Sequence, residues 1–416
     1  MSRGYSYPPN ARHSGIYGSG EARSAVKPYE SAQAVEGDAY KPKIVYWNNQ
    51  PTPYVVDRFN ALAERGHLDF EAWFSSRREW DRNWDVDESN WQFAYRYLPS
   101  ITIRGHVLAL TALALKKRRP DLIVSLYGHI SYVLGFALAR LRGVRAVFWV
   151  EPTFDSWMNR QPFKDHLKSL LFARADAVFT TGKDGGKFAE RFDADKNQIY
   201  HLPYFNQFNF FNAARAGAQR DRTWLRNELG LAGVTFLYVG RLWKGKGVHH
   251  LLDAFKGLQQ SCAEPVSLMI VGDGEEDRAL RERCRNESIA HVVFTGFKQR
   301  GELPNYYAAS DVFVFPTLGD PYGLVLDEAM ASGLPVITTD AVGELCDRVE
   351  DGITGIVVKA ADGSALRDKM RLLALHPQLR HQLSAAGTAK VSGQTPEKWA
   401  ADFELAVRSV LKAKTV

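Results

Sequence analysis

The sequence predicts an α/β protein of two domains that face a cleft, each with a mostly parallel, doubly wound sheet. Short apolar segments typical of buried strands alternate with helical segments along most of the chain. The alternation is interrupted near residues 206–232 and then resumes, which indicates two domains. The 416 residues, 45% of them hydrophobic and 24% charged, suffice for two globular cores.

Residues 1–40 lack this alternation. They are rich in Gly, Ser, Tyr, Ala and Pro, and their basic and acidic residues balance, so we expect a disordered tail and no polybasic membrane arm. The N-terminal domain is then expected over residues 41–205. Its predicted strands are 42–47, 69–74, 122–127, 145–150 and 176–181, and its predicted helices are 55–65, 104–118, 133–142 and 163–174.

The second series of elements forms the C-terminal domain, expected over residues 233–393 after a linker at 206–232. Its predicted strands are 234–240, 266–272, 291–296, 312–316 and 335–339, and its predicted helices are 248–260, 275–285, 302–309, 323–332 and one from about 364. Residues 394–416 are expected to form a helix that packs back toward the N-terminal domain. Because ligands of such sheets bind beyond the carboxyl ends of the strands, the loops after these strands are the first candidates for a site.

A glycine-rich loop with two cations follows the first strand of the C-terminal domain. Gly240 and Gly247 bound the stretch GRLWKGKG and permit a close approach of backbone to a ligand. Arg241 and Lys246 can bind phosphate oxygens, and the next helix N-terminus favours an anion. We therefore predict a diphosphate site. A P-loop is disfavoured because Gly247 replaces the magnesium-binding Ser or Thr; the alternative is an ordinary turn with exposed charges.

A second pair of glycines, Gly272 and Gly274, ends the next strand. It fails as a dinucleotide fingerprint because Asp277 stands where the third glycine belongs. Taken alone, the pair is equally well explained by a tight turn.

Two carboxylates flank the start of the helix predicted at 323–332. Asp320 precedes this helix and Glu328 lies eight residues later. The free backbone N–H groups at Gly323, Leu324 and Val325 would suit a diphosphate, while the carboxylates could accept sugar and ribose hydroxyls. The alternative is structural, with Glu328 in a surface salt bridge and Asp320 as a turn former.

GRLWKGKG followed by DPYGLVLDEAMASGLPVI resembles the retaining glycosyltransferases of family 4 (glycosyl transferases group 1), which have the GT-B fold of two Rossmann-like domains. The likeness is strong over residues 233–390 and looser over 42–205. It implies that Arg241 and Lys246 bind the diphosphate of a nucleotide sugar, that Glu328 binds the ribose, and that Asp320 contacts the donor hexose.

The sequence departs from the family pattern at several positions near these residues. Asp320 replaces the usual Glu and Tyr322 the usual Phe. Glu344 follows Gly343 where the family usually has two glycines, and Asp347 stands where it usually has Glu. Because the side chain of Asp320 is one methylene shorter than that of Glu, it reaches less far toward the hexose.

The resemblance also implies retention at the anomeric carbon, with the leaving diphosphate neutralised by cations and a helix N-terminus instead of a metal. No cofactor or metal is therefore expected. Asp85-Val86-Asp87 fits the DxD pattern of metal-dependent GT-A enzymes, but no apolar strand precedes it, so we interpret it as loop composition. In the N-terminal domain, His129 and Glu151 follow predicted strands and are candidate catalytic residues; the alternatives are a surface histidine and a helix-capping carboxylate.

The candidate site thus has two parts. The candidate catalytic residues are Arg241, Lys246, His129 and Glu151, and the candidate donor-binding residues are Gly240, Gly272, Gly274, Asp320, Tyr322, Gly323, Leu324, Val325 and Glu328. For the acceptor, the resemblance points to the loop 48–54, for which a stiff turn is the alternative. We also consider an aromatic platform made by seven tryptophans within residues 41–160: Trp47, Trp73, Trp80, Trp84, Trp91, Trp149 and Trp157. Core packing is the alternative for these rings.

The remaining features concern the compartment. Three widely spaced cysteines fit no disulfide or zinc pattern, no apolar run approaches membrane-spanning length, and the N-terminus lacks a signal peptide's apolar core, so a cytoplasmic protein is expected. The segments 106–119 and 162–174 combine Leu or Phe with Lys and Arg, as interfacial helices do, which would allow peripheral contact with the inner membrane face; core helices with basic ends are the alternative. The net charge of +6 does not require nucleic acid.

Together these observations predict a hexosyltransferase that uses a UDP- or GDP-linked donor and a glycan or polyprenyl-linked acceptor in surface polysaccharide biosynthesis. A nucleotide-sugar epimerase or hydrolase of the same fold, and a non-catalytic nucleotide-sugar-binding subunit, are the alternatives.

Overall fold

The structure is a computed structural model, and it describes residues 40–77, 87–103, 106–109, 111–151, 162–205, 208–218 and 222–413. Residues 41–416 form one compact unit. The predicted tail at 1–40, except Tyr40, lies outside the described residues, as do Trp80, Trp84, Asp85, Val86 and Trp157.

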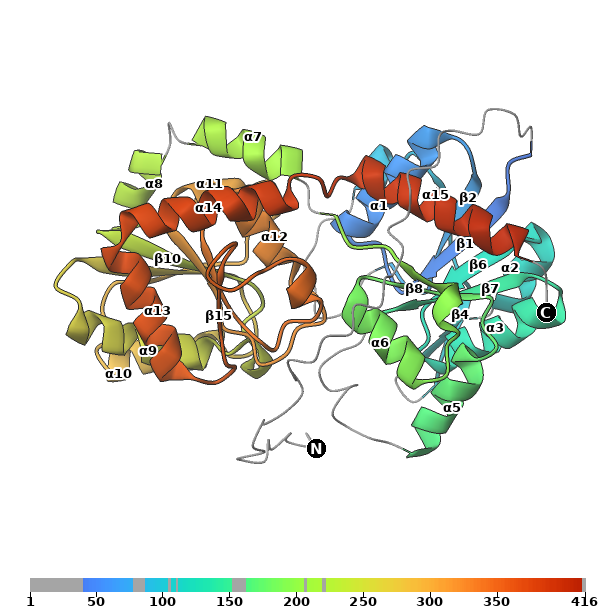
Figure 1. Cartoon of the computed structure of the whole chain (residues 1–416), viewed down its shortest axis with the longest axis horizontal. Helices are drawn as coiled ribbons and strands as arrows, with labels where there is room; N and C mark the ends of the chain where they lie inside the picture. Colours follow the sequence, from blue (N-terminus) through green and yellow to red (C-terminus); the bar gives the residue numbers. More distant parts are fainter. Residues whose placement is uncertain are drawn as a thin grey trace. The chain divides into compact units, whose positions relative to one another are not determined.

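The described part of the N-terminal half contains a parallel seven-stranded sheet with the order β3-β2-β1-β6-β7-β8-β9 (Figure 1). Its strands are β1 (Lys43–Asn48), β2 (Asp69–Phe74), β3 (Ala94–Tyr97), β6 (Leu122–Ser125), β7 (Arg145–Val150), β8 (Ala177–Thr180) and β9 (Ile199–His201). Strands β4 (Ser100–Ile103) and β5 (His106–Ala109) form a separate antiparallel pair.

Both faces of this sheet are covered, so its inner strands β2, β1, β6, β7 and β8 are largely buried on both sides. One face packs against α1 (Pro53–Arg65) and α15 (Pro396–Lys412). The other packs against α2 (Thr111–Arg118), α3 (Ile130–Leu141), α5 (Pro162–Phe172) and α6 (Lys183–Arg191). Helix α1 begins where Thr52 accepts a hydrogen bond from Val55 N, and it ends at Gly66, whose φ of 65° lies in the left-handed region.

The C-terminal half contains a parallel six-stranded sheet, described completely, with the order β12-β11-β10-β13-β14-β15. Its strands are β10 (Val234–Val239), β11 (Val266–Val271), β12 (Val292–Gly296), β13 (Val312–Phe315), β14 (Val336–Thr339) and β15 (Ile356–Val358). Its helices are α9 (Val248–Ser261), α10 (Asp277–Asn286), α11 (Leu303–Ala308), α12 (Leu324–Ala331), α13 (Gly363–Leu375) and α14 (Pro377–Val391).

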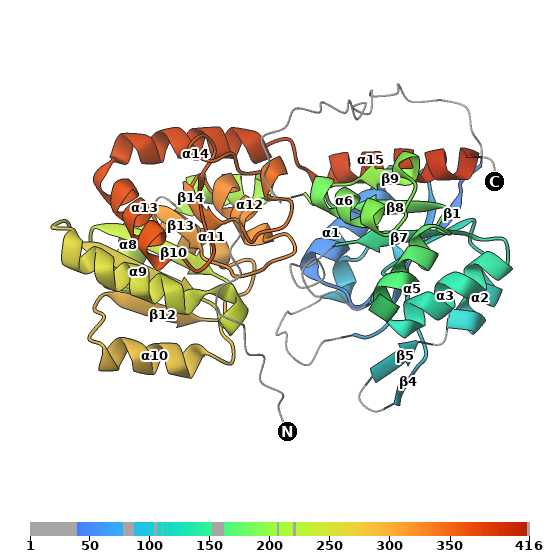
Figure 2. The ribbon, with the colours of Figure 1, turned by 60° about the horizontal axis from the view of Figure 1, so that its bottom comes forward.

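The chain returns to the N-terminal half at its end. Helix α15 places Trp399 and Phe403 in the hydrophobic cluster of Ile44 and Phe59, and it packs beside α1 (Figures 1 and 2). Within the described residues, no helix is both long and apolar enough to cross a bilayer.

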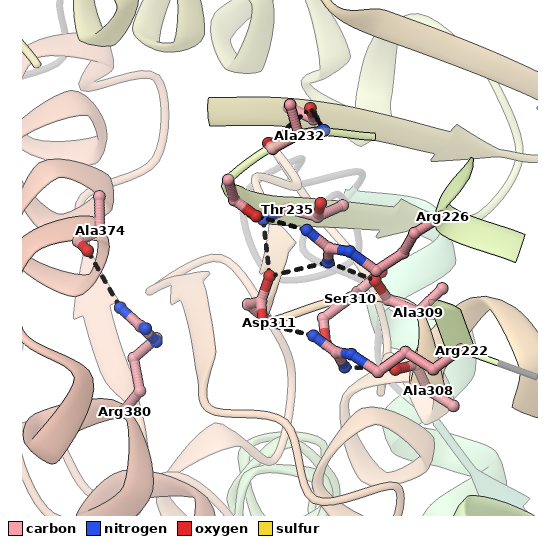
Figure 3. A network of polar contacts seen from close by, with 12 residues as sticks. Arg222, Arg226, Ala232, Thr235, Ala308, Ala309, Ser310, Asp311, Ala374 and Arg380 are labelled. Carbon is pink, nitrogen blue, oxygen red and sulfur yellow. Dashed lines mark hydrogen bonds and ion pairs between the residues drawn. The ribbon is translucent and has the colours of Figure 1, made fainter. Parts of the chain in front are cut away.

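The segment predicted as a linker at 206–232 is largely helical, which corrects that expectation. It holds α7 (Phe208–Ala218) and α8 (Arg222–Glu228), and Phe211 is buried in the C-terminal core. Arg222 and Arg226 both bind Asp311, with shortest N–O distances of 2.7 and 3.1 Å, and donate to backbone carbonyls before β13 (Figure 3). These ion pairs attach α8 to the sheet.

The helix predicted at 104–118 is also wrong in its first half, where residues 106–109 form strand β5 and pair with β4. The nearly continuous apolar run of this segment fits a strand as well as a helix over so few residues.

Candidate active site

The loops that follow β10 and β13 meet at one edge of the C-terminal sheet, because these two parallel strands are neighbours. Leu318 N donates to Gly245 O at 2.8 Å, which joins the loops directly. Gly247 has a φ of 69°, and a Cβ there would lie 1.9 Å from Pro316 O, so this position requires glycine. The loop 240–247, predicted to bind phosphate, is therefore joined directly to the loop after β13 that carries Asp320.

Lys246 and Asp320 make an ion pair across these two loops. The Lys246 side chain is 17% exposed, and its ammonium also lies 5.4 Å from the centre of the Phe315 ring. Asp320 in addition accepts a hydrogen bond from Tyr322 N at 2.9 Å, which orders the turn before α12. The cation expected to bind a diphosphate and the carboxylate expected to bind a hexose are thus in contact.

The other predicted phosphate-loop residues lie close by. The Arg241 side chain is exposed, and its carbonyl accepts a hydrogen bond from Tyr238 Oη at 2.9 Å. Gly272 and Gly274 pack against this loop: a Cβ on Gly272 would lie 1.9 Å from Gly240 O, and one on Gly274 2.3 Å from Leu242 O. Their observed contribution is close backbone packing.

Helix α12 begins at the donor-binding positions predicted from its sequence. Gly323 is its N-cap, with φ 74° and ψ 60°, and Leu324 and Val325 form its first turn. A glycine cap has no side chain to accept from these N–H groups, which leaves the helix N-terminus suited to an anion. Tyr322 precedes the cap and is buried, with its ring 3.9 Å from the Arg348 guanidinium carbon.

Arg348 stabilises the turn before α12. It is fully buried, pairs with Asp327 at 3.2 Å and donates to the carbonyls of Tyr322 and Gly343. Neither Arg348 nor Asp327 was a predicted site residue. Only their burial and contacts in the structure show that they stabilise the turn before α12. Burial raises the pKa of the Asp327 carboxyl, and Arg348 opposes that rise.

Glu328 is 1% exposed and accepts hydrogen bonds from two tyrosines. Tyr307 Oη on α11 donates to one carboxylate oxygen at 2.7 Å, and Tyr54 Oη on α1 donates to the other. Burial raises the pKa of Glu328, although both hydrogen bonds oppose the rise. Two hydroxyls, one on each carboxylate oxygen, are the arrangement that a ribose diol would also offer.

Tyr54 and Tyr307 were not predicted. Tyr54 ends the loop NNQPTPY, which the sequence had indicated as an acceptor-facing segment. Its ring lies 5.7 Å from the guanidinium carbon of Arg300, and Arg300 pairs with Asp57 of α1 at 2.7 Å. Tyr307 gives no signal in the sequence beyond its place in a helix.

The candidate residues of the N-terminal domain lie in different settings. His129 is half-buried at the N-cap of α3, where its ring accepts a hydrogen bond from Ser131 N at 3.3 Å. Glu151 accepts hydrogen bonds from Trp149 Nε1 and Tyr204 Oη. Tyr204 in turn packs its ring 5.0 Å from that of Tyr322, so Glu151 is connected to the turn before α12.

The expected aromatic platform is not supported for three of its tryptophans. Trp47, Trp73 and Trp149 are each at most 1% exposed and belong to the cores on the two faces of the N-terminal sheet. Among the described residues, no group of three or more His, Cys, Asp or Glu side chains is arranged to hold a metal ion.

The two parallel, doubly wound sheets define the fold of one class of proteins, the GT-B proteins. Two solved structures illustrate it. Anabaena HepE in complex with UDP and glucose superposes with a TM-score of 0.72 and 18% identity over 88% of this chain and 100% of that chain. The sucrose-phosphate synthase of Thermosynechococcus elongatus gives 0.71 and 20% over 90% and 100%.

The sequence comparisons agree. Residues 226–390 match the model of the family described as glycosyl transferases group 1. The phosphatidyl-myo-inositol mannosyltransferase of Mycobacterium leprae (strain TN) is 36% identical over 162 residues, 38% of this chain and 42% of that protein. The capsular polysaccharide biosynthesis glycosyltransferase CapM of Staphylococcus aureus is 32% identical over 162 residues, 38% and 41%. The chain thus spans less than half of the length of these two relatives, and the family match covers residues 226–390, which include most of the C-terminal half.

Proposed function

We propose that this protein is a retaining glycosyltransferase that moves a hexose from a UDP- or GDP-linked donor to a glycan or polyprenyl-linked acceptor. The observation that carries the proposal is the convergence of Lys246, Asp320 and the α12 N-terminus at one edge of the sheet, with Glu328 about one turn into that helix. HepE, whose structures contain UDP and glucose, shares the fold, and the named relatives include enzymes of capsule and lipid glycosylation.

In this proposal the chain's own charges stabilise the leaving group. Lys246 and Arg241 bind the diphosphate together with the N–H groups at Gly323, Leu324 and Val325. Lys246 exchanges its bond to Asp320 for one to phosphate, which frees the Asp320 carboxylate for a hexose hydroxyl. Glu328 accepts the ribose hydroxyls. This arrangement neutralises the developing charge without a metal ion.

A panel of labelled UDP-, GDP- and ADP-sugars, incubated with and without glycan and polyprenyl-phosphate sugar acceptors, tests the proposal. Transfer of label to an acceptor with retained anomeric configuration is the expected result. Label released to water or converted to an epimer without acceptor would instead identify a hydrolase or epimerase. Binding without any product would indicate a binding subunit, and either result would refute the proposal.

We also propose that the N-terminal domain contacts an anionic membrane surface through α2, α3 and α5, which lie in one layer (Figure 2). The outward face of α3 is apolar. Ile130, Leu134 and Leu141 lie on one side of this helix and are all exposed, and Leu141 is 85% exposed. On α5, Phe163 is 83% exposed and Leu170 is also exposed.

Basic side chains accompany these apolar ones. Lys116 and Lys117 end α2, Arg142 follows α3, and Lys164 lies in the first turn of α5; all four are exposed. Neither α2 nor α3 contains an acidic residue. Large apolar side chains among cations match the chemistry of an anionic lipid interface.

Co-sedimentation with phosphatidylcholine vesicles, with and without about 30% phosphatidylglycerol, tests this contact. The protein should bind the anionic vesicles, and a Leu134→Ser, Leu141→Ser variant should lose most of this binding. Trp224→Ser removes another exposed large apolar side chain, from α8, and should have no effect. Equal binding by both variants, or none by the wild type, would refute the membrane face.

A further inference from the structure

Glu344 lies in a backbone conformation that its side chain does not favour. It follows β14, directly before a short 3-10 turn (Leu345–Asp347), with φ 54° and ψ 24° in the left-handed region. Yet Glu344 is only 1% exposed, so its side chain is held inside the protein. An unfavourable backbone around a buried acid indicates that the carboxylate makes contacts that maintain it.

Those contacts are with the N-terminus of α6, in the other half of the protein. The two carboxylate oxygens of Glu344 accept hydrogen bonds from Asp184 N and Gly185 N, both at 2.8 Å. Asp347, three residues on, accepts from Lys183 N at 3.1 Å and pairs with the Lys183 ammonium at 2.9 Å. Three consecutive N–H groups of one helix are thus capped by two carboxylates from far along the chain, where the helix dipole favours negative charge.

The α6 side is shaped to admit these carboxylates. A Cβ on Gly182 would lie 2.4 Å from a Glu344 oxygen and 2.8 Å from an Asp347 oxygen, and a Cβ on Gly185 would lie 3.1 Å from Glu344 Oε1. Gly182 is the N-cap of α6 and has no side chain to cap the helix itself. The two sides of the contact are therefore complementary in charge and in shape.

The loop that carries Glu344 is also hydrogen-bonded to the loop at residues 319–323, which we call the donor loop. Gly343 N donates to Asp320 O at 2.8 Å, and Asp320 N donates to Ala341 O at 3.1 Å. Arg348 links the carbonyls of Gly343 and Tyr322. A displacement of Asp320 or Tyr322 on ligand binding would therefore be transmitted through this loop to Glu344 and to α6.

We infer that Glu344 and Asp347 form a clasp that couples the donor loop to helix α6 of the N-terminal domain, and that Glu344 is a positioning residue for the reaction. The inference rests on the proposed function in one respect, that the donor occupies the loop at residues 319–323. The clasp fixes how the N-terminal domain is held when the donor is bound.

Hydrogen–deuterium exchange of α6 tests the clasp, with Glu344→Gly, which suits the backbone conformation, as the variant. The matched control is Asp362→Ala, which removes a carboxylate cap from α13 within the C-terminal domain. Without ligand, the amides of Asp184 and Gly185 should exchange at least about tenfold faster in Glu344→Gly than in the wild type and the control. Equal exchange would overturn the clasp.

The coupling is measured by adding UDP or GDP. In the wild type and in Asp362→Ala the nucleotide should change α6 exchange by about threefold or more, and in Glu344→Gly by less than a third of that, at equal nucleotide saturation. A response retained in Glu344→Gly, or absent from the wild type despite binding, would overturn the coupling. If neither nucleotide binds the wild type, the donor assignment and the coupling fail together, while the exchange comparison without ligand still decides the clasp.

Discussion

Replacing Lys246 with alanine removes the cation that the proposal places on the leaving diphosphate. In the structure this ammonium is largely buried and paired with Asp320. A charge-assisted hydrogen bond contributes about 1.5–3 kcal/mol, which corresponds to roughly 10- to 100-fold in affinity. Because Lys246 must first leave Asp320, we expect the lower end of this range for the Kd of UDP or GDP, and a larger loss in turnover as charge develops.

Isothermal titration calorimetry with UDP and GDP measures this effect, and Lys244→Ala is the control. Lys244 lies two residues earlier in the same loop and is exposed, so its replacement changes the net charge equally. The difference between the two variants isolates direct contact from long-range attraction. Equal Kd values for Lys246→Ala and Lys244→Ala would refute the phosphate assignment.

Three further expectations concern the same site. Arg241→Ala should lower turnover by at least about tenfold through the loss of a phosphate contact, and unchanged turnover would remove it from the site. Glu328→Gln should weaken UDP or GDP binding by about tenfold. Burial raises the pKa of Glu328 in the native state above its value in the unfolded chain. At a pH between these two pKa values, the native state retains a proton that the unfolded state has released, so the free energy of unfolding falls as pH rises through this range. Glu328→Gln should therefore melt above the wild type near neutral pH, with a difference that vanishes toward about pH 4; a pH-independent difference would contradict the burial argument. Transfer should persist in EDTA, and strict dependence on manganese would contradict metal-independent stabilisation.

The fold could be predicted because many strands of the two parallel sheets, such as β6, β10, β11 and β13, are short and predominantly apolar runs. Strands β10, β11, β12 and β13 end at or directly before glycine or proline, so the phosphate loop and the loop before α12 could be located within a few residues. The segment 206–232 lacks such runs, and α8 is held by ion pairs from Arg222 and Arg226 to Asp311. Pairs of that sequence separation leave no local pattern, so the segment by itself predicts a linker.

The same limit applies to the site. Lys246 and Asp320 could each be proposed from their own loops, but their pairing across 74 residues could not. The contact of Tyr54 with Glu328 joins residues 274 apart, and the clasp at Glu344 depends on glycines in α6. The tryptophans show the converse error, since residue type suggested a sugar platform while their places on buried strands put Trp47 and Trp73 in the core.

A crystal structure of the protein with UDP or GDP bound tests the central assignment most directly. The diphosphate should lie within hydrogen-bonding distance of Lys246, Arg241 and the first N–H groups of α12, with the ribose hydroxyls on Glu328. A nucleotide bound elsewhere, or an occupied site in which Lys246 still pairs with Asp320 and does not touch phosphate, would contradict the account.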